Sequence, residues 1–126
     1  MPAGLRMVRA LDRAVLEVAR RLDLRPMELY ALLLLRAGGR LTTAALADQL
    51  AASSSQAKQL ALRLCARGMA ERESPSGRTE LTPLGAAVAD SAERELRDTM
   101  HERMSRIDDT SRLHGRETLA ELTLPA

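Results

Sequence analysis

The chain has 126 residues, enough for one domain or a small domain with helical extensions. It has no Phe or Trp and only one Tyr, so Leu, Val, Ala and Met must build the core, and the abundance of Leu and Ala predicts a mostly α fold. A single cysteine excludes an intramolecular disulfide, and the longest apolar run, Leu29–Leu35, is far too short to span a bilayer. Because Arg6, Arg9 and Asp12 interrupt the early apolar runs, no signal peptide is expected, and the sequence predicts a cytoplasmic protein without a membrane partner.

The charge distribution along the chain is uneven, although the net charge is only +2. Residues 36–78 carry seven basic side chains and three acids, whereas residues 79–126 carry six Arg and ten acids. A basic middle segment suggests contact with a polyanion, and chance clustering on a solvated surface is the alternative interpretation.

Two helices are predicted in the first third of the chain. Apolar residues with alternating spacings of three and four form one stripe of the first helix: Val8, Leu11, Val15, Val18 and Leu22. Pro26 suits the first turn of a second helix, Met27 to about Ala37, which is apolar nearly all round and should be the buried centre. Gly38-Gly39 ends it.

A helix-turn-helix pattern follows these two helices. A third helix is predicted over Thr43–Leu50, capped by Thr42 or Thr43. Ser53 and Gln56 have the spacing of a capping box and open a fourth helix that runs to Arg67, with Gly68 after its end. Two short helices joined by a tight turn form this motif.

A hairpin and a long helix are predicted after Gly68. Strands are expected over Glu71–Glu73 and Arg78–Leu81, and Thr82-Pro83 starts the helix. Apolar positions spaced by four residues drift around this helix and are expected to face first the domain core and then another surface: Leu84, Val88, Ala92, Leu96, Met100 and Met104. A polar break is expected over Asp108–Gly115, and the chain should end on a short helix containing Leu119, Leu122 and Leu124.

The outward face of the fourth helix carries the functional signal. Ala57, Leu60, Ala61 and Leu64 share the side expected to pack on the core. The opposite side and its flanks present amides, hydroxyls and cations without a carboxylate: Ser54, Ser55, Gln56, Lys58, Gln59 and Arg63. Such side chains suit insertion into a DNA major groove, whereas a face that is only solvated would more often mix Glu with Lys or Arg.

Three further residues extend this interface. Arg72 and Arg78 flank the hairpin turn, so a basic finger could reach the minor groove or its phosphates, and an ordinary connecting hairpin is the alternative. Thr43 begins the preceding helix and is a further candidate DNA contact. Leu62 also points outward and either touches a thymine methyl group or is partly buried.

The order of these elements, from about Arg25 to Thr110, resembles the MarR family of bacterial winged helix-turn-helix regulators. The strings that carry the resemblance are Leu41-Thr42-Thr43-Ala44-Ala45-Leu46-Ala47, Ser53-Ser54-Ser55-Gln56-Ala57-Lys58, Leu64-Cys65-Ala66-Arg67-Gly68-Met69-Ala70-Glu71-Arg72 and Leu81-Thr82-Pro83-Leu84-Gly85. The resemblance implies a homodimer held by the first, fifth and sixth helices, with residues 1–24 and 83–126 as dimerisation segments and residues 25–82 as the DNA-binding lobe. It also implies binding to double-stranded DNA half-sites roughly 34 Å apart, usually as a repressor, with release by a small phenolic ligand or an oxidant.

The wing departs from the family pattern, because Ser76 stands where the acid of a D-x-R string is expected before Arg78. Glu73 or Glu80 could replace that acid as the partner that orients Arg78. An effector pocket would lie between the dimer helices and the DNA-binding lobe, where Arg13, Met27 and Tyr30 are near enough in sequence to line it, as are other core residues.

No residue pattern of a catalytic site, a cofactor site or a metal site is present, so a non-enzymatic protein without cofactors is expected. Cys65 is interpreted as a packing residue, and the alternative is a redox sensor whose pKa is lowered by Arg67. The sequence thus predicts a sequence-specific dimeric transcription regulator. Two alternatives are a winged-helix protein-interaction module that has lost DNA binding and a DNA-packing protein without sequence preference, the latter predicting a more basic chain.

Overall fold

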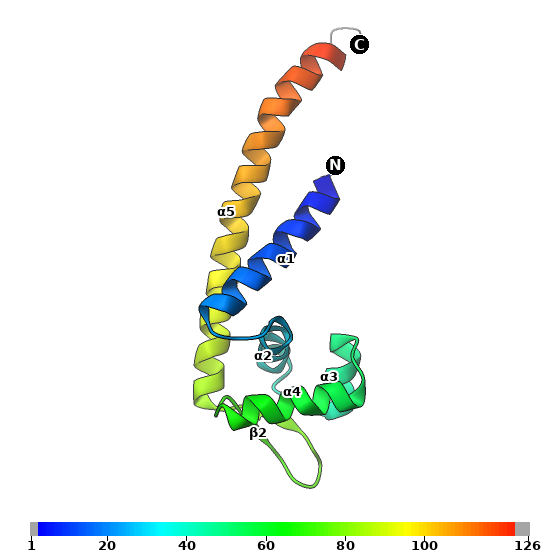
Figure 1. The fold of residues 1–126 in the computed structure, drawn as a ribbon, viewed down its shortest axis with the longest axis vertical. Coiled ribbons are helices and arrows are strands. Elements are labelled where there is room, and N and C mark those ends of the chain that lie inside the picture. Colours follow the sequence, from blue (N-terminus) through cyan, green and yellow to red (C-terminus); the bar gives the residue numbers. More distant parts are fainter. Residues whose placement is uncertain (1–2, 123–126) are drawn as a thin grey trace.

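A computed structural model describes the backbone of residues 3–122 and the side chains of residues 4–106. Five helices and three short strands follow one another along this part of the chain (Figure 1): α1 (Ala3–Arg21), α2 (Pro26–Gly38), β1 (Arg40–Leu41), α3 (Thr43–Leu50), α4 (Ser54–Ala66), β2 (Ala70–Arg72), β3 (Thr79–Leu81) and α5 (Pro83–Leu122). The fold is mostly α with one small antiparallel sheet, as the sequence predicts.

Helix α2 is the centre of the core. Leu29, Leu32 and Leu35 are almost completely buried, and α1, α3, α4 and α5 all pack against this helix. In a chain without Phe or Trp, alanines at the contacts let the helices approach closely, and Ala14, Ala57, Ala89 and Ala92 are buried. The predicted buried centre is confirmed.

Side-chain caps fix the helix-turn-helix. The Thr42 hydroxyl accepts a hydrogen bond from the backbone N–H of Ala45 at 3.1 Å, which identifies Thr42 as the cap of α3. Ser53 and Gln56 exchange bonds of 3.0 and 3.1 Å in the predicted capping box of α4. The turn between them passes through Ala51 with a φ of 53°, a left-handed conformation that usually favours Gly or Asn.

The sheet has the strand order β1-β3-β2, and its hairpin forms the wing. The predicted hairpin is confirmed: the first strand begins and ends one residue earlier than predicted, and the second begins one residue later and ends as predicted. Strand β1 was not predicted, since two residues are too few for an alternating pattern to show. Its register places Arg40 opposite Glu80, and the two side chains form an ion pair of 2.9 Å.

The long helix corrects two predictions. α5 continues without interruption from Pro83 to Leu122, so the polar break over Asp108–Gly115 and the separate last helix are wrong, and Leu124 lies outside the described residues. One glycine within a helix costs only about 1 kcal/mol, and no proline interrupts this segment. The inner face agrees with the predicted stripe at Ala92, which is buried, but differs elsewhere, because Gly85, Ala89 and Thr99 are also buried whereas Leu84 is exposed.

Helix α1 is only half covered. Its C-terminal part packs on α5, and Val15 and Val18 of the predicted stripe are buried in the core. Toward the N-terminus α1 and α5 diverge (Figure 1), and Val8 of the same stripe is 56% exposed. A row of large apolar side chains on this helix therefore faces solvent: Leu5, Met7, Val8, Leu11 and Leu16. Within residues 3–122, no helix is long and apolar enough to cross a membrane.

Candidate nucleic-acid interface

Helix α4 lies across the end of the molecule opposite the free ends of α1 and α5, next to the wing (Figure 1). Its four predicted core residues are all buried: Ala57, Leu60, Ala61 and Leu64. This packing holds the helix on α2 and α3 and turns its other face outward. The predicted division of α4 into a core side and a free side is confirmed.

The free side of α4 carries most of the predicted DNA contacts. Ser54, Ser55, Gln56, Lys58 and Gln59 are all exposed. The side-chain oxygen of Gln56 already accepts the capping bond from the Ser53 N–H, so its amide N–H groups are the part that can still contact another molecule. The α4 sequence contains Lys58 and Arg63 but no acid, and the positive end of the helix dipole adds to this charge. The surface therefore favours a polyanion.

Two residues of α4 deviate from a purely polar free face. Leu62 is 46% exposed, so the structure favours the outward orientation of this side chain over burial. Arg63 is half-buried and lines a pocket behind the helix. The outer surface of α4 is thus polar toward its N-terminus and partly apolar toward its C-terminus.

The wing is tied to the helix-turn-helix through Arg72. Its Nη2 atom donates a 3.0 Å hydrogen bond to the hydroxyl of Thr43 in the first turn of α3, and Arg72 is half-buried. Arg72 therefore lies at the base of the wing. The Thr43 hydroxyl keeps its own proton to donate, because the bond from Arg72 uses it only as an acceptor.

Arg78 lies at the exposed side of the wing. The hairpin closes through hydrogen bonds between Glu73 and both Gly77 and Arg78, with Gly77 at a φ of 71°. No carboxylate among residues 4–106 lies within ion-pair distance of the Arg78 side chain. Glu80, one of the two expected partners, is paired with Arg40 instead, and a hydrogen bond and the nearby charge of Glu80 raise the pKa of Arg40.

Cys65 is half-buried beside the wing. Burial raises the pKa of the Cys65 thiol, with Arg72 acting weakly in the opposite direction and Glu71 adding to the rise. The hypothesis that Arg67 lowers this pKa is wrong, because the pKa is raised and the cation that opposes the rise is Arg72. In the described part of the chain, no group of three His, Cys, Asp or Glu side chains could hold a metal ion.

Comparison with known proteins identifies the fold. No protein-family model matches the sequence, and no curated protein matches it. Among solved structures, the chain is similar to a MarR family protein of Mycobacterium tuberculosis (24% identity, TM-score 0.73, covering 94% of this chain and 89% of that one). It is also similar to the reduced form of MarR from E. coli (22%, TM-score 0.74, 99% and 95%) and to NadR in complex with 4-hydroxyphenylacetate (21%, TM-score 0.74, 95% and 92%). The chain therefore has the winged-helix fold of MarR proteins over nearly its whole length.

Proposed function

We propose that this chain is a MarR-type transcriptional regulator that binds double-stranded DNA through α4 and the wing. The observation that carries the proposal is the exposed, carboxylate-free face of α4 beside an exposed arginine of the wing. The winged-helix fold shared with MarR proteins supports it. In this function the chain acts by binding and is not an enzyme.

Each exposed residue has a role that follows from its chemistry. Gln59 projects from the middle of α4 and can form paired hydrogen bonds with an adenine edge in the major groove. Lys58 and the hydroxyls of Ser54 and Ser55 suit phosphates, as does the donor left on Thr43. Arg78 would contact the neighbouring minor groove or its phosphates, and Arg72 would hold the wing at the correct angle through Thr43.

A homodimer is the proposed active form. The exposed large apolar side chains of α1 (Leu5, Met7, Val8, Leu11 and Leu16) lie mostly on the part of the helix that diverges from α5, toward the end of the molecule opposite α4. A contiguous apolar surface of this kind is typical of an interface between subunits. With residues 1–24 and 83–126 as dimerisation segments, the two copies of α4 would read half-sites roughly 34 Å apart. We propose that the dimer represses transcription from its site.

A small-molecule effector is part of the proposal. NadR, with the same fold, was solved with 4-hydroxyphenylacetate bound. A ligand that binds the DNA-free arrangement better than the DNA-bound one would release the protein from its site by that difference in affinity.

A protein-interaction module is the second candidate. Ser76 replaces the acid expected before Arg78, and Arg78 has no carboxylate partner within residues 4–106. An arginine of the wing without an ion-pair partner to orient it would contribute less to DNA binding. This favours a protein-interaction module that has the winged-helix fold but binds a protein in place of DNA.

DNA binding across a salt series distinguishes the two candidates. The purified chain is titrated with the DNA upstream of its own coding sequence and with a scrambled duplex of the same composition, from low to physiological salt. Regulation predicts tighter binding to the upstream duplex and a linear fall of log K with log salt concentration. No binding to either duplex at low salt would refute DNA binding, and equal binding to both would refute sequence specificity.

A further inference from the structure

Leu62 lies on the helix that carries the proposed DNA contacts but has no role among them. Its side chain is 46% exposed. The core does not account for it, because the buried residues of α4 lie on the other side of the helix: Ala57, Leu60, Ala61 and Leu64. Among the described residues, the other large apolar side chains that are exposed lie on α1, α2 and α5. Leu62 is thus an apolar side chain that faces solvent on a surface suited to DNA.

Helical spacing places Leu62 in one row with Ser55 and Gln59. The three exposed positions are separated by four and then by three residues, which is the spacing of side chains on one face of a helix. At about 1.5 Å per residue, Ser55 and Leu62 are about 10 Å apart along the axis. This distance corresponds to about three base-pair steps of roughly 3.4 Å. A helix that brings Ser55 and Gln59 against base edges therefore brings Leu62 into the same groove.

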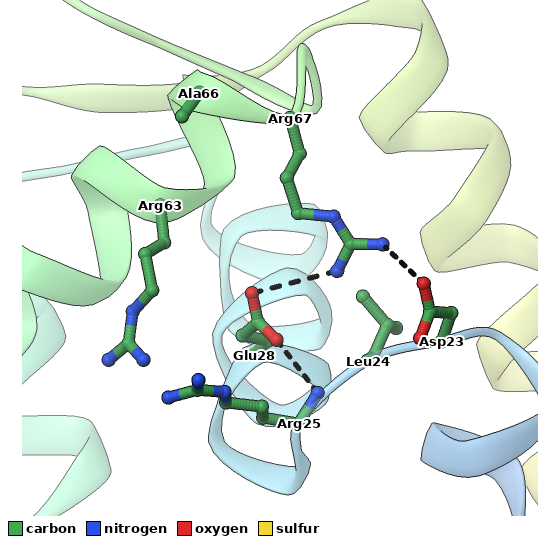
Figure 2. Close-up of a pocket in the computed structure, with 7 residues that line it drawn as sticks. All are labelled: Asp23, Leu24, Arg25, Glu28, Arg63, Ala66 and Arg67. Carbon is green, nitrogen blue, oxygen red and sulfur yellow. Dashed lines mark hydrogen bonds and ion pairs between the residues drawn. The ribbon is translucent and has the colours of Figure 1, made fainter.

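The neighbouring cation does not cover this part of the row. Arg63 is half-buried, and its guanidinium extends toward the pocket at the start of α2, where Arg25 also lies (Figure 2). Ala66, one turn after Leu62, is exposed and has no polar group in its side chain. The row is therefore polar at Ser55 and Gln59 and apolar from Leu62 onward.

We propose that Leu62 contacts the methyl group of a thymine in the major groove. The base edges in this groove present hydrogen-bond donors, hydrogen-bond acceptors and the thymine methyl group, and only the methyl group is apolar. A leucine placed against a donor or an acceptor would remove its water without replacing the hydrogen bond, which is unfavourable. Contact with the methyl group instead buries apolar surface on both molecules.

The position of this thymine relative to the other contacts follows from the helix. Leu62 is about 4.5 Å along the axis from Gln59. The thymine should therefore lie one or two base pairs from the pair that Gln59 contacts, at about 3.4 Å per step. This inference rests on the proposed DNA binding and adds to it the base that Leu62 selects.

Replacement of thymine by uracil tests the contact, because uracil lacks only the methyl group and pairs with adenine in the same way. The duplex upstream of the coding sequence is amplified with dTTP or with dUTP, and the affinity of the purified chain for each form is measured at one salt concentration. The variant is Leu62→Ala, and the control is Leu84→Ala, which removes an exposed leucine of α5 outside the proposed interface. Alanine is the better helix former at position 62, and circular dichroism checks that both variants are folded.

We expect the wild type and Leu84→Ala to bind the uracil duplex about fourfold more weakly for each α4 that makes the contact, as loss of one buried methyl group implies. Leu62→Ala should bind the two duplexes alike. A change of DNA shape caused by uracil would affect all three proteins equally, so the comparison isolates the side chain. Duplexes with a single uracil should place the effect one or two base pairs from the pair at which Gln59→Ala relaxes the preference.

Two results would overturn the role of Leu62 and leave the proposed DNA binding intact. The first is equal affinity of the wild type for the thymine and uracil duplexes. The second is a preference for the thymine duplex that is undiminished in Leu62→Ala. A wild type that binds neither duplex would instead refute the proposed function, and the role of Leu62 with it.

Discussion

Gly85 is the glycine at which an added methyl group should lower the stability of the fold most. It lies in the first turn of α5, where the helix crosses the turn that follows α4. A Cβ atom built at Gly85 would be 1.8 Å from the backbone oxygen of Met69 and 2.7 Å from its carbonyl carbon. Ordinary contacts require roughly 3.5 Å, so a Gly85→Ala variant must move either α5 or the Met69 backbone.

That movement would break the junction between α5 and the winged helix-turn-helix. The backbone N–H of Thr82 donates to the Met69 oxygen at 3.1 Å, and the Thr82 hydroxyl donates to the Gly68 oxygen at 2.6 Å while accepting from the Gly85 N–H at 3.1 Å. Overpacking costs about 1–3 kcal/mol, and each lost hydrogen bond about 1 kcal/mol. The gain in helix propensity from Gly to Ala is only about 1 kcal/mol. We therefore expect Gly85→Ala to lower the free energy of unfolding by about 2–4 kcal/mol.

Urea denaturation followed by circular dichroism measures this change. Gly4→Ala is the matched control, because Gly4 also lies in a helix but nothing is within 4 Å of an added Cβ there. That variant should be neutral or stabilised by up to about 1 kcal/mol. If Gly85→Ala were as stable as the wild type to within about 1 kcal/mol, the close crossing of α5 over Met69 would be refuted.

Three further substitutions and one labelling experiment test the site and the helix on which it is built. Gln59→Ala should cost about 1–3 kcal/mol at one base pair and relax the preference there, as measured on duplexes with single base changes; unchanged discrimination would contradict base reading. Arg78→Ala should weaken binding to all duplexes alike and reduce the salt slope by about 1, whereas an unaltered slope would remove Arg78 from the phosphate contacts. The pH at which iodoacetamide alkylates Cys65 at half its maximal rate should be higher in the folded chain than in urea, because burial raises the pKa of the thiol. A lower pH for the folded chain would restore the sensor hypothesis. Ser53→Ala should lower the free energy of unfolding by about 1 kcal/mol, seen as a lower urea midpoint. An unchanged midpoint would show that the Ser53 cap does not stabilise the fold.

Most helix boundaries and buried helix faces could be predicted from local signals in the sequence. Thr42, Ser53 and Gln56 mark helix starts because their side chains bond to free backbone N–H groups within three residues, and such contacts are visible in the spacing. The burial of Ala57 and Leu64 followed from helical period alone. Most of the exposed face of α4 was therefore predictable, with Arg63, which is half-buried, as the exception.

Contacts between distant segments were not predictable in this way. The bond from Arg72 to Thr43 and the pair of Arg40 with Glu80 depend on how the sheet brings segments together, and nothing in the local pattern marks them. The same holds for the buried Glu28, whose partners come from the N-terminus of its own helix and from the end of α4. The continuity of α5 was missed because polar residues were interpreted as a break, although a solvated helix can be polar on most of its surface.

The uninterrupted course of α5 has a mechanical consequence. A 40-residue helix is about 60 Å long, at roughly 1.5 Å per residue. A rotation of one degree about one end therefore displaces the other end by about 1 Å. Thr82 and Gly85 anchor the start of α5 to the winged helix-turn-helix. In the proposed dimer, small changes in the angle between the two copies of α5 would change the separation of the two copies of α4 by several ångströms. The proposed dimer could then fit DNA sites of slightly different spacing by tilting alone, without repacking either winged helix.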